Sequence, residues 1–116
     1  MNVNFIKRIR KEKFMYEIKS KDITLAKENL TVFSRVIDKD NALEVEVGTN
    51  GHHSDEYHTR TYFRLTNIAG TCFDCIKQGE DTVELIFYGN SELDTFIKAL
   101  EFALRALKEQ KNGRDE

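Results

Sequence analysis

Five side chains that bind soft metal ions lie close together in this sequence. The octet Gly51–His58, GHHSDEYH, contains all three histidines of the chain, and both cysteines follow in the segment CFDC at 72–75. Zn²⁺ prefers imidazole and thiolate ligands in a tetrahedral set of four, and the spacing C-x-x-C lets two thiolates approach one ion. The sequence therefore predicts a zinc ion bound by Cys72, Cys75, His53 and His58, with His52 as the substitute for His53.

A second interpretation needs no metal. In an extended strand Cys72 and Cys75 point to opposite faces, so that Cys75 is a small buried apolar side chain and the octet is a polar surface loop. Binding of one ion by both cysteines requires a turn, which Gly70 can supply. A redox role for C-x-x-C is disfavoured because no βαβ pattern surrounds it. Four protein ligands would make the ion structural, whereas three would leave a catalytic position open, with Glu56 as the candidate base.

Recognisable catalytic motifs are absent from the sequence. The chain has no phosphate-binding loop, dinucleotide fingerprint, nucleophile elbow or H-E-x-x-H segment. Ser54 beside His53 is the only serine–histidine pair, and neighbouring loop residues rarely form a nucleophile and its base. We therefore expect a protein that acts by binding and not by turnover, with a small metal-dependent hydrolase built on the 51–58 loop as the alternative.

Length and composition indicate one soluble domain over residues 1–116. The chain has 33% charged residues and a net charge of −2, and no linker or internal repeat divides it. No apolar run is long enough to cross a membrane, and the basic N-terminus lacks the apolar region of a signal peptide. The sequence thus predicts a cytoplasmic protein that contacts no membrane, and the negative net charge disfavours direct binding to nucleic acid.

Hydrophobic periodicity predicts strands followed by one long helix. Leu43, Val45 and Val47 alternate with Glu44 and Glu46, which is typical of a strand with one solvent-facing side. The same reasoning predicts a short helix at 3–12. It predicts strands at 14–18, 23–26, 31–37, 43–47, 60–65, 71–76 and 82–88, with a turn at 19–22 between the first two strands.

Residues 91–112 have the apolar spacing of an amphipathic helix, with Ser91 as the expected N-cap and Asp94 in the capping-box position. A sheet of five to six antiparallel strands with this helix on its apolar face buries both apolar surfaces. The predicted fold class is α+β.

Three residues are candidates for contacts with a partner. Phe102 lies opposite the main apolar stripe of the predicted helix, among the small residues Thr95, Ala99 and Ala106, where loops, a protein partner or a second copy of the chain would cover it. Glu44 and Glu46 are expected to point outward and to suit a basic partner.

The segments LEVEVGTNG, RTYFRL and ELDTFIKALEFALRALK resemble small uncharacterised proteins of phages and mobile elements of the Firmicutes type. The chain is similar in these respects to the class that contains anti-CRISPR inhibitors, some of which carry a structural metal. The resemblance implies a stoichiometric inhibitor of a host defence effector such as a Cas9-type nuclease, and it carries over no functional residue. A further alternative is a nucleotide-capturing oligomer in which Tyr62 stacks on a base and Arg64 clamps a phosphate.

Overall fold

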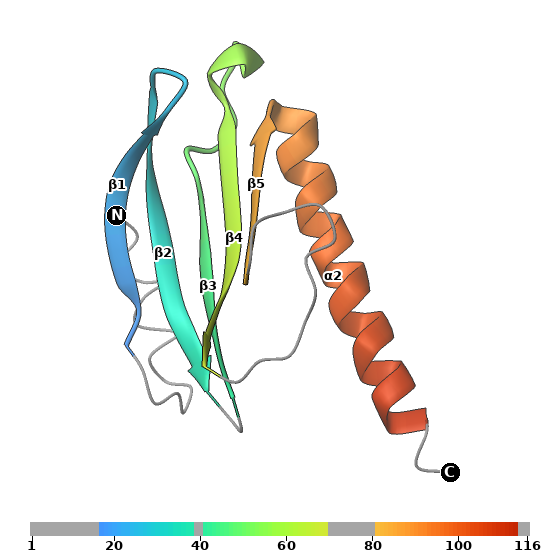
Figure 1. The fold of residues 1–116 in the computed structure, drawn as a ribbon. Helices are drawn as coiled ribbons and strands as arrows, with labels where there is room; N and C mark the ends of the chain where they lie inside the picture. Colours follow the sequence, from blue (N-terminus) through green and yellow to red (C-terminus); the bar gives the residue numbers. More distant parts are fainter. Residues whose placement is uncertain (1–16, 39–40, 70–80, 114–116) are drawn as a thin grey trace.

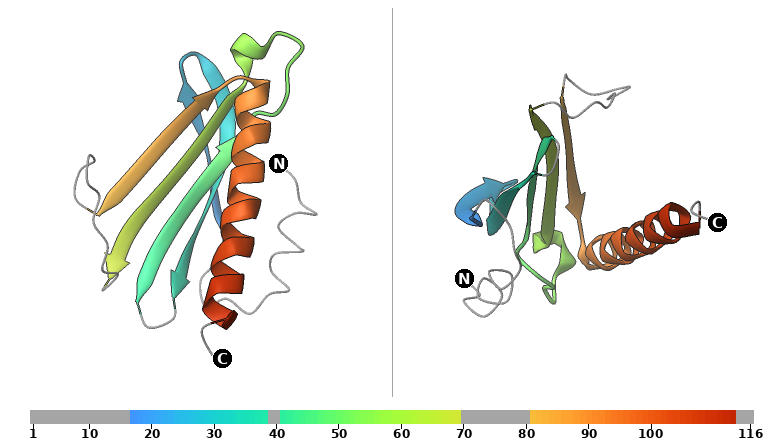
Figure 2. Two further views of the ribbon diagram at one scale, coloured as in Figure 1. Left: turned by 90° about the vertical axis from the view of Figure 1, so that its right-hand side faces the viewer. Right: turned by 90° about the horizontal axis from the view of Figure 1, so that it is seen from below.

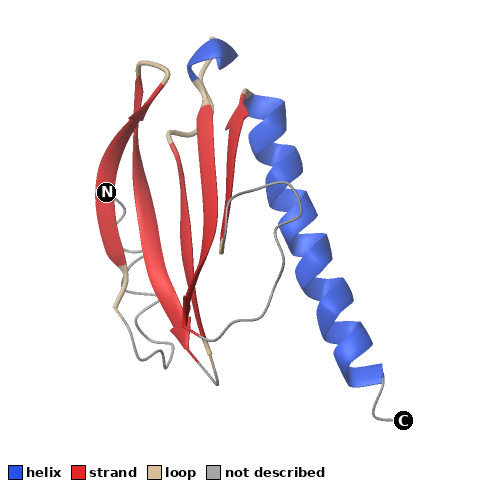
Figure 3. Cartoon of the chain, viewed as in Figure 1, coloured by secondary structure: helices blue, strands red, loops and turns tan. Residues whose placement is uncertain are grey.

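The computed structural model describes residues 17–38, 41–69 and 81–113. Five strands form one antiparallel sheet in the order β1-β2-β3-β4-β5, and one long helix follows the last strand (Figures 1 and 3). The elements are β1 (Lys19–Leu25), β2 (Glu28–Asp38), β3 (Ala42–Thr49), η1 (Glu56–His58), β4 (Arg60–Ala69), β5 (Thr82–Tyr88) and α2 (Asn90–Gly113). The predicted α+β class is confirmed.

The first hairpin differs from its prediction. Lys19–Asp22, expected as a turn, belongs to β1, and the chain reverses at Ala26 and Lys27 instead. Both turn residues have positive φ, 46° and 70°, which is the backbone twist that a two-residue hairpin connection requires. The alternation rule missed this turn because neither residue is a glycine or an asparagine. The expected elements at 3–12 and 71–76 lie outside the described residues, as do residues 14–16 of the strand expected at 14–18, whose residues 17–18 belong to no strand.

Strand register separates the two faces of the sheet. Val47 lies opposite Phe33 and Phe63, and Phe63 lies opposite Leu85, so these apolar side chains share one face. On the other face Arg64 lies between Glu46 and Glu84. The predicted alternation in β3 is confirmed, because Val47 and Glu46 lie on opposite faces. The prediction that the glutamate face is the solvent-facing one is wrong, because Glu46 is buried.

The most deeply buried apolar side chains lie on the face of the sheet turned away from α2. Leu30, Val32 and Tyr62 form this cluster, and Ile23 and Leu25 from β1 pack against it. These residues share a face because the register aligns Val32 with Gly48 and Gly48 with Tyr62. Viewed from below, the sheet curves so that β1 bends toward this face (Figure 2, right). The hairpin β1–β2 thus covers the side of the sheet that the helix leaves open.

Helix α2 contacts the sheet only with its first turns. Phe96 stacks on Phe87, with ring centroids 4.6 Å apart, and meets Phe63 edge-on at 5.4 Å. Towards its C-terminus the helix leads away from the sheet (Figures 1 and 2). Leu104 is consequently 56% exposed and Leu107 66% exposed, although both belong to the apolar stripe that was predicted to cover the sheet.

The start of α2 also differs from the predicted cap. Gly89 has φ 117° and its carbonyl accepts the first helical hydrogen bond, from Leu93 N at 3.3 Å, so Gly89 holds the N-cap position. Ser91, the expected N-cap, lies inside the helix. Within the described residues no helix has the length and apolar character needed to cross a membrane.

Candidate functional site

The loop between β3 and β4 contains the three histidines. The side chain of Asn50 closes this loop: its Nδ2 donates to His58 O at 2.7 Å, and its Oδ1 accepts from Arg60 N at 2.8 Å. Asp55 caps the short helix η1 by accepting from Tyr57 N at 3.1 Å. The loop therefore has a defined backbone, although its sequence resembles that of a polar surface loop.

Asn90, the first residue of α2, joins this loop to the helix. Its Oδ1 accepts from Thr59 Oγ1 at 2.6 Å and from His53 N at 3.1 Å, and its Nδ2 donates to His53 O at 2.8 Å. Thr59 has no solvent exposure. The loop and the helix start are thus fixed together by one amide side chain, a contact that sequence analysis missed because Asn90 was assigned no role.

The three histidines point to different neighbours. His52 Nε2 donates to Asp94 Oδ1 on α2 at 2.8 Å, and His58 Nδ1 donates to Glu28 Oε2 at the start of β2 at 2.7 Å. His53 Nδ1 donates to Gly51 O at 2.9 Å, within its own loop. The ring centroids of His53 and His58 lie 6.2 Å apart. The loop consequently bridges the β1–β2 hairpin and the helix.

The bond between His58 and Glu28 changes the acidity of both groups. The hydrogen bond that His58 donates to Glu28 raises the pKa of His58 above 6.5, and the charge of Glu28 acts in the same direction. The hydrogen bond from His58 lowers the pKa of Glu28 below 4.5. Each group thus favours the charged form of the other, even though the His58 side chain is about half exposed.

The geometry bears on the histidine half of the predicted zinc site. In both His53 and His58, Nδ1 donates a hydrogen bond to an oxygen atom. The other ring nitrogen, Nε2, is therefore the one that would bind a metal, as in many histidine ligands. Asp55 Oδ2 lies 3.6 Å from His58 Nε2. Nevertheless, among the described residues no three or more His, Cys, Asp or Glu side chains are grouped to hold one ion. Cys72 and Cys75 lie outside the described residues.

Strand β4 carries the chain from the histidine loop to Ala69 at the opposite end of the sheet (Figure 1). Cys72 and Cys75 follow Ala69 in the sequence. That these cysteines meet the histidine loop around one zinc ion stays a prediction.

The acidic residues predicted to contact a partner do not both face solvent. Glu46 is 7% exposed and lies 3.4 Å from Lys21 Nζ, on the same face of the sheet as Arg64. The expectation that Glu46 points outward is wrong, because the curved sheet and the β1 lysine cover it. Glu44, two residues nearer the start of β3, is partly buried.

Tyr62 and Arg64 are not arranged to capture a nucleotide. Tyr62 is 5% exposed, and its hydroxyl donates to Glu84 Oε2 at 2.5 Å. Burial and this bond raise the pKa of Tyr62 to about 12. A ring buried on both sides offers no face to a base, so the structure opposes the proposed stacking role.

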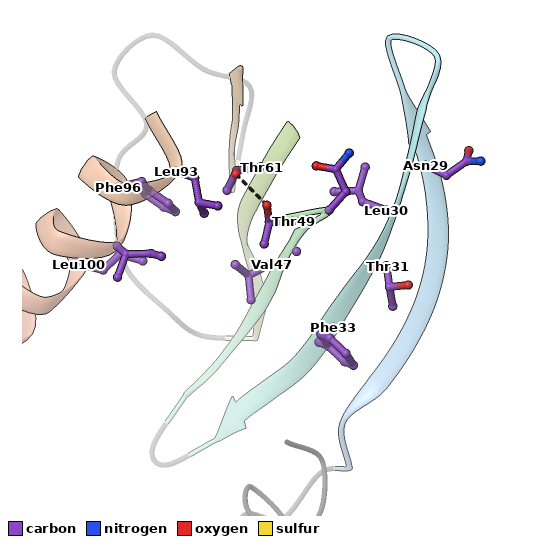
Figure 4. Close-up of a pocket in the computed structure, with 13 residues that line it drawn as sticks. Asn29, Leu30, Thr31, Phe33, Val47, Thr49, Thr61, Leu93, Phe96 and Leu100 are labelled. Atoms are coloured by element: carbon purple, nitrogen blue, oxygen red, sulfur yellow. Dashed lines mark hydrogen bonds between the residues drawn. The ribbon is translucent and has the colours of Figure 1, made fainter. Parts of the chain in front are cut away.

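An open apolar groove lies between α2 and the opposite strands (Figure 4). Its volume is about 640 Å³. The side chains of Leu93, Phe96 and Leu100 point from the helix across the groove toward Val47, with Phe33 on its far wall (Figure 4). Threonines and asparagines also line it, and none of the lining residues in the described part of the chain is charged. Sequence analysis missed the groove because it assumed that the helix would lie flat on the sheet.

Phe102 is 73% exposed, the most exposed apolar side chain of α2. This exposure agrees with the prediction that it lies outside the core; its contact with a partner stays a prediction. Comparison with known proteins adds no assignment: no protein-family model, no curated protein and no solved structure matches this chain.

Proposed function

We propose that this chain is a non-enzymatic binding protein that holds a helix of a protein partner in the groove between α2 and the sheet. The observation that carries the proposal is the uncharged, apolar lining of the groove, from Phe33 and Val47 on the sheet to Ile97 and Leu100 on the helix. Amphipathic helices bind such grooves through apolar side chains spaced i, i+3 or i+4 and i+7.

The shape of the apolar surface favours an elongated occupant. Beyond the groove, Leu104 and Leu107 continue the exposed stripe along α2, and Ile37 and Leu85 are exposed on the facing side of the sheet. A compact ligand would fill the groove of about 640 Å³ and leave this stripe in water. A helix laid along α2 would cover both, and burial of apolar surface supplies about 25 cal/mol per Å².

The partner is proposed from the resemblance of the sequence. The resemblance to small phage and mobile-element proteins makes a Cas9-type nuclease the first candidate, and inhibition of such an effector is the function that we propose on that basis. A structural zinc ion remains part of this proposal, to be tested separately. The burial of Glu46 moves the expected contact from acidic strands to the apolar groove.

Titration of a Cas9-type nuclease with the purified chain tests the proposal. We expect inhibition that saturates near a one-to-one ratio and leaves the mass of both proteins unchanged. Leu100→Glu, in the groove, should weaken inhibition at least tenfold, whereas Ile68→Glu should leave it unchanged. Ile68 is a matched control because it is an exposed apolar residue on β4 outside the groove.

Three outcomes would contradict parts of the proposal. Inhibition at trace amounts, or a cleaved target, would indicate an enzyme. An equal loss of inhibition in Leu100→Glu and Ile68→Glu would place the contact with the partner outside the groove. Absence of inhibition would reject this nuclease as the partner. Binding of the fluorescent dye anilinonaphthalene sulfonate, reduced by Leu100→Glu alone, would still show that the groove accepts apolar ligands.

A further inference from the structure

The apolar surface of α2 is wider than one neighbour can cover. At 100° per residue, the main stripe around Leu100 and a second face around Phe102 together extend over about 220° of the helix. The sheet and the groove account for the first half of the stripe, from Leu93 to Leu100. The small and apolar residues of the second face are Thr95, Ala99, Phe102 and Ala106, and its only large apolar side chain, Phe102, is exposed.

The position of Phe102 along α2 suits a two-fold contact. The helix extends from Asn90 to Gly113, so its midpoint falls between Glu101 and Phe102. If two such helices pack antiparallel about this point, Phe102 lies beside its own copy. Ala99 and Ala106, one turn to either side, leave the space that a partner's phenylalanine needs, and small residues allow helix axes to approach to about 8 Å.

The charges of the helix favour the antiparallel direction. Residues 90–101 carry three acids and one lysine, a net charge of −2, whereas residues 102–113 carry three bases and one glutamate, a net charge of +2. Antiparallel packing sets the acidic half of one helix against the basic half of the other and also opposes the helix dipoles. Parallel packing would place like charges together.

One pair of charged residues fixes the register more closely. Lys98 and Glu109 lie four residues before and seven residues after Phe102, on the same row of the helix surface. In an antiparallel pair centred on Phe102, Lys98 of each copy comes within about three residues, or roughly 4.5 Å along the axis, of Glu109 of the other. Two equivalent ion pairs would then flank the central phenylalanines.

We propose that two copies of this chain associate through this second face of α2, antiparallel, with Phe102 against Phe102. The occupant is a second copy because a two-fold contact must be self-complementary, and this face has its single large apolar side chain at its centre and opposite net charges at its ends. The face is separate from the groove, so this inference does not rest on the proposed function.

Sedimentation equilibrium of the full chain tests the inference. We expect wild type to reach twice its mass of 13.5 kDa as concentration rises, and Phe102→Glu to raise the dimer dissociation constant about thirtyfold or more, as for a central interface residue. Phe102→Leu should retain most of the association. Lys98→Glu and Glu109→Lys should each weaken it, and the double variant should recover it.

The charge-reversal set keeps the inference testable if Phe102→Glu fails to fold, because Lys98 and Glu109 are exposed. Recovery in the double variant would not follow from a merely structural role of either residue. A wild-type chain that stays monomeric at millimolar concentration would overturn the inference. Weakening by both single variants without recovery in the double variant would overturn the antiparallel register.

Discussion

Thr59 Oγ1 donates a 2.6 Å hydrogen bond to Asn90 Oδ1, which joins the residue before β4 to the first residue of α2. This bond matters because α2 contacts the sheet mainly near its start. Asn90→Ala removes the acceptor for Thr59 and both bonds to the His53 backbone. Because the loss leaves the buried Thr59 hydroxyl with only its longer contact to His53 Nδ1, at 3.3 Å, we expect the free energy of unfolding to fall by about 1–3 kcal/mol.

Chemical denaturation followed by circular dichroism measures this change. Asn90→Asp is the matched control, since it keeps the Oδ1 acceptor for Thr59 and loses only the bond to His53 O. It should fall between wild type and Asn90→Ala. A variant Asn90→Ala as stable as wild type would show that the loop does not hold the start of the helix.

The hydrogen-bonded pair of His58 and Glu28 predicts that the stability of the fold depends on pH. The pKa of His58 is raised, so its contribution to stability is present below pH 6.5 and is lost as pH rises through its higher value in the folded chain. The pKa of Glu28 is lowered, so its contribution is present above pH 4.5 and is lost as pH falls through its lower value in the folded chain. The pair of His58 and Glu28 therefore stabilises the fold most between about pH 4.5 and 6.5.

Melting temperatures of wild type and Glu28→Gln across pH 4–9 check this window. The difference between the two proteins should be largest at pH 5–6 and should shrink above neutrality, as His58 loses its proton. Asp94→Asn, which removes the separate His52 contact, is the control for a general effect of acid removal. A difference that grows with rising pH would contradict the assigned direction of the His58 shift.

Most of the sheet could be predicted from alternation of apolar and polar residues. Val45 and Val47 in β3 and Phe63 and Leu65 in β4 mark their faces without further information. The turn at Ala26 was not predictable because its positive φ is imposed by hairpin pairing and not by residue type. The length of α2 was predictable, but its departure from the sheet was not, because periodicity reveals an apolar face and not what covers it.

The candidate site was predictable only in part. Clustering of the histidines correctly drew attention to the loop between β3 and β4, yet the bonds that organise it come from Asn50 and Asn90, which lie at its edge and on α2. Such long-range amide contacts leave no spacing signal in a sequence. The burial of Glu46 likewise depends on the curvature of the sheet, which alternation alone does not determine.

Zinc binding can be divided experimentally into its two predicted halves. The predicted tetrahedral site takes two thiolates and two imidazoles. We therefore expect both Cys72→Ala/Cys75→Ala and His53→Ala/His58→Ala to lose the zinc that native mass spectrometry detects in the wild-type monomer. Retention of zinc by His53→Ala/His58→Ala would show that these histidines do not bind the ion, and a wild-type chain without zinc would reject the site.

Gly48 tests the packing on the face turned away from α2. A β-carbon at this position would lie 2.8 Å from both Cα and Cγ1 of Val32, and closer still to the carbonyl oxygen of Thr31. Backbone atoms cannot move aside without disturbing the pairing of β2 with β3. We expect Gly48→Ala to lower the free energy of unfolding by about 1–3 kcal/mol, in the range of overpacked cores.

Gly113→Ala is the matched control, because a β-carbon there meets no atom within 4 Å. It should change the free energy of unfolding by less than about 1 kcal/mol, the range of helix propensity between glycine and alanine. Thermal melting of the two variants beside wild type makes the comparison. Gly48 aligns with Val32 on one side and with Tyr62 on the other. A Gly48→Ala variant as stable as wild type would therefore mean that β2 and β3 are not packed as closely as the register requires. The buried cluster of Leu30, Val32 and Tyr62 would then need another arrangement.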